Sequence, residues 1–126
     1  MVVAALSAWH ERHEDAAAAV APVTDLPAHV MLEAYSVLTR LPGGLAVPAT
    51  TAAAVLETRF DGPPLRLGAR DRRGLLTMLA TAGVFGGAIY DGLVALEAHA
   101  HGSTLLSLDE RAQDTYRRLG VSFRVL

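Results

Sequence analysis

The 126-residue sequence contains no cysteine, no lysine and no long apolar run. Without cysteine there is neither a disulfide framework nor a thiolate zinc site. No apolar run approaches the roughly 20 residues that cross a bilayer, and the first residues have no basic region typical of a signal peptide. We therefore expect a single domain over residues 1–126, cytoplasmic and without a membrane partner.

The basic residues are all arginine, 11 in number, in a chain of net charge −2. This net charge excludes a general binder of polyanions. The absence of lysine argues against receiver-like phosphoacceptor domains and haloacid-dehalogenase-like phosphatases, since both normally place a lysine beside the phosphoryl group. Hydrophobic residues make up 52% of the chain, which is enough for a substantial core.

The apolar spacing predicts helices alternating with strands, and hence an α/β domain with a mostly parallel sheet covered by helices. A helix over 69–82 is expected to bury Leu75, Leu76 and Leu79. The expected helices are His10–Val20, Ala28–Leu41, Thr50–Phe60 with a cap at Thr50 or Thr51, Ala69–Ala82, Ala88–Ala98 and the segment from Asp109 to Leu119. The expected strands are Ser103–Asp109 and Val121–Leu126, with a short strand or extended link at Pro22–Pro27, a short strand at Pro64–Leu67 and at most a strand stub in Met1–Leu6.

Three acids stand out. Asp91 lies near the start of an apolar helix, Asp109 ends a buried strand, and Glu33 falls on the apolar stripe of its own helix. Each has an ordinary explanation: a helix dipole for Asp91, a helix cap for Asp109 and an edge position for Glu33. If the strand is parallel, its end opens into the crevice where ligands of α/β sheets bind. Convergence there predicts an oxygen-only site for Mg²⁺, or Mn²⁺, which activates water for phosphodiester hydrolysis.

The order of these elements resembles a PIN domain, in particular the VapC toxins of type II toxin–antitoxin pairs. The matching segments are Val2–Leu6, Leu32–Leu38, Tyr90–Ala95 and Leu105–Asp109. The resemblance implies a three-layer α/β/α fold and a Mg²⁺-dependent endoribonuclease, usually a homodimer, that a cognate VapB-like antitoxin inhibits. It also implies that Glu33, Asp91 and Asp109 are the second, third and fourth acids of the family.

One family feature is absent from the printed sequence. PIN domains open with a strand ending in Asp-Thr/Ser-Ser/Asn, just before an apolar stretch like Val2–Leu6. The first strand is therefore expected to be truncated here, and a natural start upstream of Met1 is favoured. If the chain acts as printed, we expect feeble metal binding and poor nuclease activity. The alternative is a catalytically impaired PIN-like module that binds antitoxin or RNA without cleavage; a flavodoxin-like binding domain, with the three acids far apart, is a more distant possibility.

The remaining charged residues have weaker claims. Arg111, two residues past Asp109, is a candidate contact for RNA phosphate. For Arg70, Arg72 and Arg73 a solvated helix face is preferred over a second phosphate-binding edge. Asp114 and Arg118, four residues apart, are expected to pair on an exposed helix face. The five histidines have no metal-binding spacing and are read as surface or packing residues.

Overall fold

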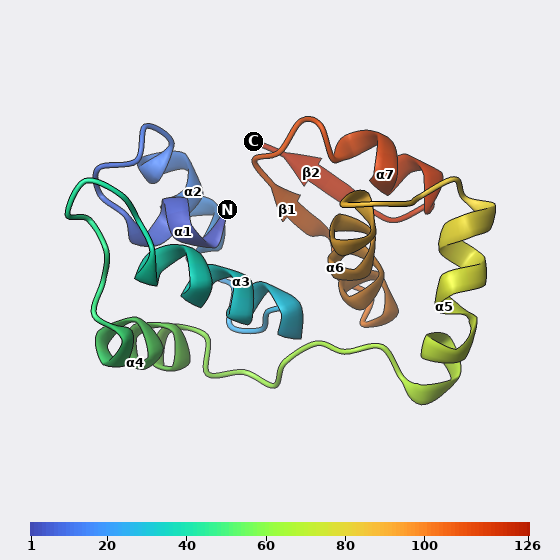
Figure 1. The fold of residues 1–126 in the computed structure, drawn as a ribbon, viewed down its shortest axis with the longest axis horizontal. Coiled ribbons are helices and arrows are strands. Elements are labelled where there is room, and N and C mark those ends of the chain that lie inside the picture. Colours follow the sequence, from blue (N-terminus) through green and yellow to red (C-terminus); the bar gives the residue numbers. More distant parts are fainter. The chain divides into compact units, whose positions relative to one another are not determined.

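The computed structural model describes residues 1–126, which form seven helices and two strands (Figure 1). They fall into two compact units, Met1–Pro64 and Leu65–Leu126. None of the helices has both the length and the apolar character needed to cross a membrane. The elements in chain order are α1 (Val2–Leu6), α2 (His13–Val20), α3 (Ala28–Thr39), α4 (Ala49–Arg59), α5 (Ala69–Thr81), α6 (Ala88–Ala100), β1 (Leu105–Ser107), α7 (Gln113–Arg118) and β2 (Phe123–Val125).

The first unit is made of α1 to α4, and α1 packs against both α2 and α3. Its apolar cluster is formed by small and branched side chains that recur at helical spacing, such as Ala34 and Leu38 on α3 and Ala52 and Leu56 on α4. Leu56 is 2% exposed, so it lies at the centre of this core.

Arg59, at the end of α4, ties α4 to the C-terminal end of α2. Its guanidinium group donates hydrogen bonds to the carbonyl oxygens of Val20 (2.6 Å), Ala21 (3.1 Å) and Val23 (2.8 Å). These include carbonyls that the end of α2 leaves without helical partners. The same cation lies 4.9 Å from the ring centroid of Phe60, which is buried. The Arg59 side chain thus donates hydrogen bonds to the carbonyl oxygens at the end of α2 and also packs over an aromatic ring.

The second unit contains α5, α6, α7 and a sheet of two parallel strands. Leu105 is opposite Phe123 and Ser107 is opposite Val125. Parallel neighbours require a crossover, and α7 supplies it between the two strands. The prediction of parallel strands at these two places is confirmed, although both strands are shorter than expected.

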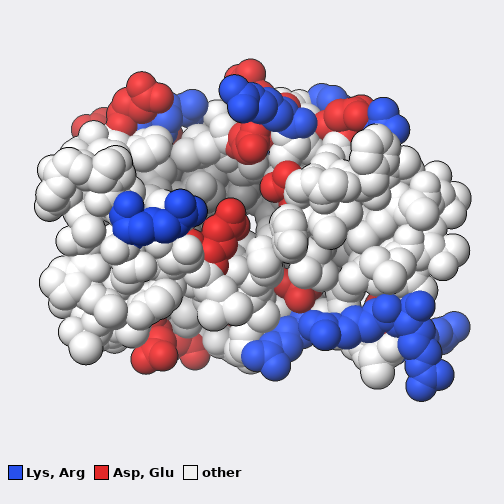
Figure 2. All heavy atoms as spheres, viewed as in Figure 1, with Lys and Arg blue, Asp and Glu red and all other residues white.

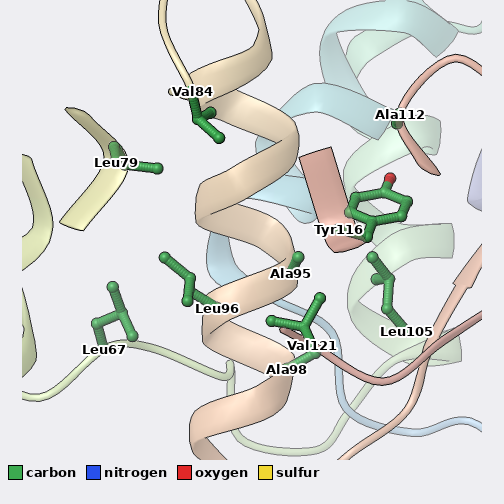
Figure 3. Packing of buried hydrophobic residues seen from close by; sticks show 10 residues of the cluster. All are labelled: Leu67, Leu79, Val84, Ala95, Leu96, Ala98, Leu105, Ala112, Tyr116 and Val121. Carbon is green, nitrogen blue, oxygen red and sulfur yellow. The ribbon is translucent and has the colours of Figure 1, made fainter. Parts of the chain in front are cut away.

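The core of the second unit surrounds α6 (Figure 3). Ala95 and Leu96 of α6 belong to the same buried cluster as Leu105 of β1 and Tyr116 of α7. The ring of Tyr116 packs against that of Phe123, with centroids 5.2 Å apart and planes tilted by 54°. Offset aromatic contact of this kind fastens α7 to β2.

Two predictions of extended structure are wrong and a third is confirmed. Val2–Leu6 is the helix α1 rather than a strand stub, and a turn separates it from α2, which begins at His13 and not His10. Pro22–Pro27 forms a link, which was one of its two expected forms, whereas Pro64–Leu67 does not form the expected strand. The physical reason is that a strand needs hydrogen-bonding partners along several consecutive residues, whereas each of these segments has a single bridge residue, Pro27 or Leu65.

Two details of the helices also differ from expectation. Pro48 occupies the N-cap position of α4, and no side chain caps the helix. Thr50 and Thr51, the expected caps, lie inside the helix. Leu76 is 77% exposed, whereas Leu79 is buried and Leu75 is half-buried. Leu75 and Leu79 are one helical turn apart and share a face, while Leu76 is rotated by about 100° from Leu75 and by about 60° from Leu79.

Candidate active site

Asp91 lies in the first turn of α6 and is half-buried. Gly83 and Gly86 have positive φ angles, 68° and 61°, which glycine adopts without strain. They allow the chain to reverse direction between the end of α5 and the start of α6. A carboxylate in the first turn of a helix is stabilised by the macrodipole. Asp91 also interacts with other groups of the protein.

The helix packs closely just beside this acid. Gly92 is buried, and a Cβ atom there would lie 3.1 Å from side-chain carbons of both Leu79 and Leu119. Glycine at this position allows α6 to approach both neighbouring side chains. The packing therefore fixes the turn of α6 from which Asp91 projects.

Asp109 lies two residues beyond the end of β1 and is exposed. The Oγ atom of Ser107 accepts a hydrogen bond from the backbone N–H of Asp109 (3.0 Å). In turn, Oδ1 of Asp109 accepts one from the backbone N–H of Arg111 (2.8 Å). Two successive side-chain-to-backbone bonds hold the loop in which the acid lies.

The predicted role of Asp109 as the cap of the following helix is wrong. The helix α7 begins at Gln113, with Ala112 in the cap position. The residues between Asp109 and Gln113 form turns. The side chain of Asp109 accepts its hydrogen bond within these turns and not from the helix. The predicted strand end is also two residues too late, since β1 ends at Ser107.

The elements that carry Asp91 and Asp109 are in contact and run in opposite directions (Figure 1). The N-terminal turn of α6 and the C-terminal end of β1 are therefore at the same end of the second unit. This end of a parallel pair is where α/β proteins bind ligands. The second unit thus supplies two acids to one end of its sheet.

Glu33 lies on α3 in the first unit and is exposed. The buried residues of α3 are Ala34 and Leu38. Val30 and Leu41 pack against the same cluster, so the apolar stripe lies where the sequence predicted it. Glu33 lies at the edge of this stripe and reaches water, as its ordinary explanation predicts. Its approach to Asp91 and Asp109 stays a prediction.

Within either unit, no three His, Asp or Glu side chains gather in a group that could bind a metal ion. The second unit does offer the carboxylates of Asp91 and Asp109. This pair suits the chemistry of Mg²⁺, which usually takes one or two protein carboxylates and keeps several water ligands. These residues fit the expected metal by donor type.

Several other predictions about charged residues can be compared with the structure. Arg111 is exposed, and only its backbone is held in the loop of Asp109. Asp114 and Arg118 form the expected exposed ion pair, with Oδ2 and Nε 2.6 Å apart.

Glu97 is a residue that the sequence reasoning missed. It lies on α6, is only 2% exposed, and interacts with other groups of the protein. A buried carboxylate is costly unless polar groups surround it. The signal in the sequence that could have identified Glu97 is its position in the middle of a helix that is otherwise apolar nearly all round.

The comparisons with known proteins agree with this architecture. The family model described as "PIN domain" matches residues 1–118. The chain belongs to the PIN domain family, and its predicted α/β fold class is thereby confirmed. The chain is 41% identical over 126 residues to a protein named Ribonuclease VapC40 of Mycobacterium tuberculosis, covering 100% of this chain and 94% of that relative. It is 43% identical over 118 residues to Ribonuclease VapC27 of the same species, covering 94% and 79%. The resemblance to VapC-type PIN domains is therefore confirmed.

Proposed function

We propose that this protein is a Mg²⁺-dependent endoribonuclease that acts as the toxin of a toxin–antitoxin pair. Membership of the PIN family and the names of two ribonuclease relatives support the nuclease assignment. The observation that supports it most is that the first turn of α6, with Asp91, and the loop after β1, with Asp109, belong to the same end of the second unit. Bound Mg²⁺, or Mn²⁺ in its place, supplies an activated water and neutralises phosphate charge.

In this proposal the acids of the chain have distinct tasks. Asp91 and Asp109 hold the metal ion, and Glu33 is the third acid of the site. Arg111 contacts a phosphate of the RNA, since its side chain extends into solvent from the loop that Asp109 closes. The partners are an RNA substrate and a cognate VapB-like antitoxin, and the active form is a homodimer.

The test is cleavage of fluorescently labelled RNA with Mg²⁺, with Mn²⁺ and with EDTA. Asp91→Asn and Asp109→Asn are expected to lower the rate by at least about 100-fold, because even changes beside the ligands of a metal cost about 10- to 100-fold. Asp114→Asn is the matched control: it removes an exposed carboxylate of α7 and should leave the rate unchanged. Glu33→Gln is paired in the same way with Glu57→Gln, an exposed acid on α4.

The alternative is a module that binds RNA or antitoxin without cleaving. The observation in its favour is that no group of three potential metal ligands is present within either unit. Mn²⁺ binding measured by calorimetry separates the two. Nuclease function predicts binding that Asp91→Asn and Asp109→Asn abolish; the alternative predicts RNA binding with neither metal binding nor cleavage.

A further inference from the structure

A cluster of arginine side chains occupies the start of α5 and the turn before it. Figure 2 shows a row of basic side chains on the face where the N-terminal half of α5 lies. The cluster consists of Arg66, Arg70, Arg72 and Arg73, all exposed. Asp71 is the one acid among them, so this segment is strongly positive in a chain whose net charge is −2.

The charges of this cluster are not neutralised within the protein. The two ion pairs of the structure, Arg12–Asp15 and Arg118–Asp114, lie elsewhere. No guanidinium group of the cluster makes a hydrogen bond to another side chain or to the backbone, whereas Arg59 makes three. Like charges gathered without a counter-charge repel one another, and a polyanion relieves that repulsion by replacing the small counterions.

The cluster lies away from the end of the unit that carries Asp91. The ring of His101, just past the C-terminal end of α6, lies 3.3 Å from the backbone nitrogen and 3.1 Å from the backbone oxygen of Arg66. Asp91 is in the first turn of the same helix. At 1.5 Å per residue, the helix separates these two positions by about 15 Å. In Figure 1, α5 runs antiparallel to α6, which places the start of α5 at that same distant end.

We propose that the arginine cluster of α5 is a second RNA-binding site, which holds the phosphate backbone several nucleotides away from the bond to be cut. This proposal rests on the nuclease function proposed above. It commits to RNA because consecutive phosphates match a row of exposed guanidinium groups, each of which binds phosphate through two parallel hydrogen bonds. A short RNA that fills only the catalytic end does not reach the cluster, whereas a longer RNA does.

The experiment compares two double variants of equal charge. Arg70→Gln/Arg73→Gln removes half of the cluster. Arg40→Gln/Arg124→Gln removes two exposed arginines outside it, neither of which makes a side-chain hydrogen bond or ion pair. Affinity for labelled single-stranded RNA of about 20 and about four nucleotides is measured by fluorescence anisotropy in EDTA over a series of salt concentrations. Cleavage of both RNAs is measured separately with Mg²⁺.

The cluster variant is expected to bind the long RNA about 10- to 25-fold more weakly than the control variant at about 0.1 M salt. The slope of log affinity against log salt concentration should be smaller by about 1.4, since each of the two lost phosphate contacts accounts for about 0.7. Binding and cleavage of the short RNA, and the melting temperature, should match the control. Equal affinity of the two variants for the long RNA overturns the proposal, as does an equal loss for short and long RNA. If no protein cleaves either RNA, the nuclease proposal fails, and the anisotropy data still decide the role of the cluster.

Discussion

Arg59→Met offers a quantitative test of how the first unit is held together. Methionine keeps an unbranched apolar stem that can pack on Phe60, but it cannot donate to the carbonyls at the end of α2. The structure gives Arg59 three such hydrogen bonds, of 2.6, 2.8 and 3.1 Å. A hydrogen bond from a charged group contributes about 1.5 to 3 kcal/mol when buried.

The full sum does not apply, because Arg59 is only half-buried and water can reach the carbonyls that it leaves. Counting the loss as one such bond plus the cation at a helix C-terminus gives about 2 to 3 kcal/mol. For a chain of 126 residues, about 1 kcal/mol corresponds to roughly 4 °C, so the melting temperature should fall by about 8 to 12 °C.

The assay is thermal unfolding followed by circular dichroism at 222 nm. Arg40→Met is the control, since Arg40 is exposed and its side chain makes no hydrogen bond or ion pair. It should shift the melting temperature by no more than about 2 °C, as surface substitutions usually change stability by under about 0.5 kcal/mol. If both variants melt together, the bonds of Arg59 to α2 do not stabilise the fold.

Three further predictions follow from the packing and the hydrogen bonds. Leu56→Ala should lower the free energy of unfolding in urea by about 3 kcal/mol, because it leaves a cavity in the first core. Gly92→Val should cost about 1 to 3 kcal/mol through overpacking and should also lower cleavage, whereas Gly74→Val, with open space around its Cβ position, should not. Ser107→Ala should cost about 1 kcal/mol and lower cleavage several-fold by loosening the loop of Asp109, with Ser122→Ala as the exposed control.

Much of the helical structure could be read from the sequence. The spacing of apolar residues in 28–41 and 69–82 predicted α3 and α5 to within a few residues. The pattern of apolar residues also predicted that Asp91 lies at the start of α6 and that Asp109 lies close to the end of a strand. A helix depends on hydrogen bonds between residues four apart, so its evidence lies within a short stretch of sequence.

The three-dimensional structure alone decided features that depend on distant neighbours. Pro64–Leu67 is apolar enough for a strand but contributes only one bridge residue, Leu65, and Val2–Leu6 is helical where a strand stub was expected. The apolar stripe of α3 was predicted correctly, but only the packing decided that Glu33, at its edge, is exposed rather than covered. The exposure of Leu76 likewise depends on which face of α5 finds a partner.

The sequence by itself determined which residue types stand at the start of α6 and after β1, and so the chemistry that this end of the sheet can support. Only the tertiary structure decided which segments pair, which faces are buried and which arginines stay without a counter-charge. The reason is physical: a helix is stabilised by bonds within itself, whereas a strand, a buried face or an ion pair exists only when another part of the chain arrives beside it.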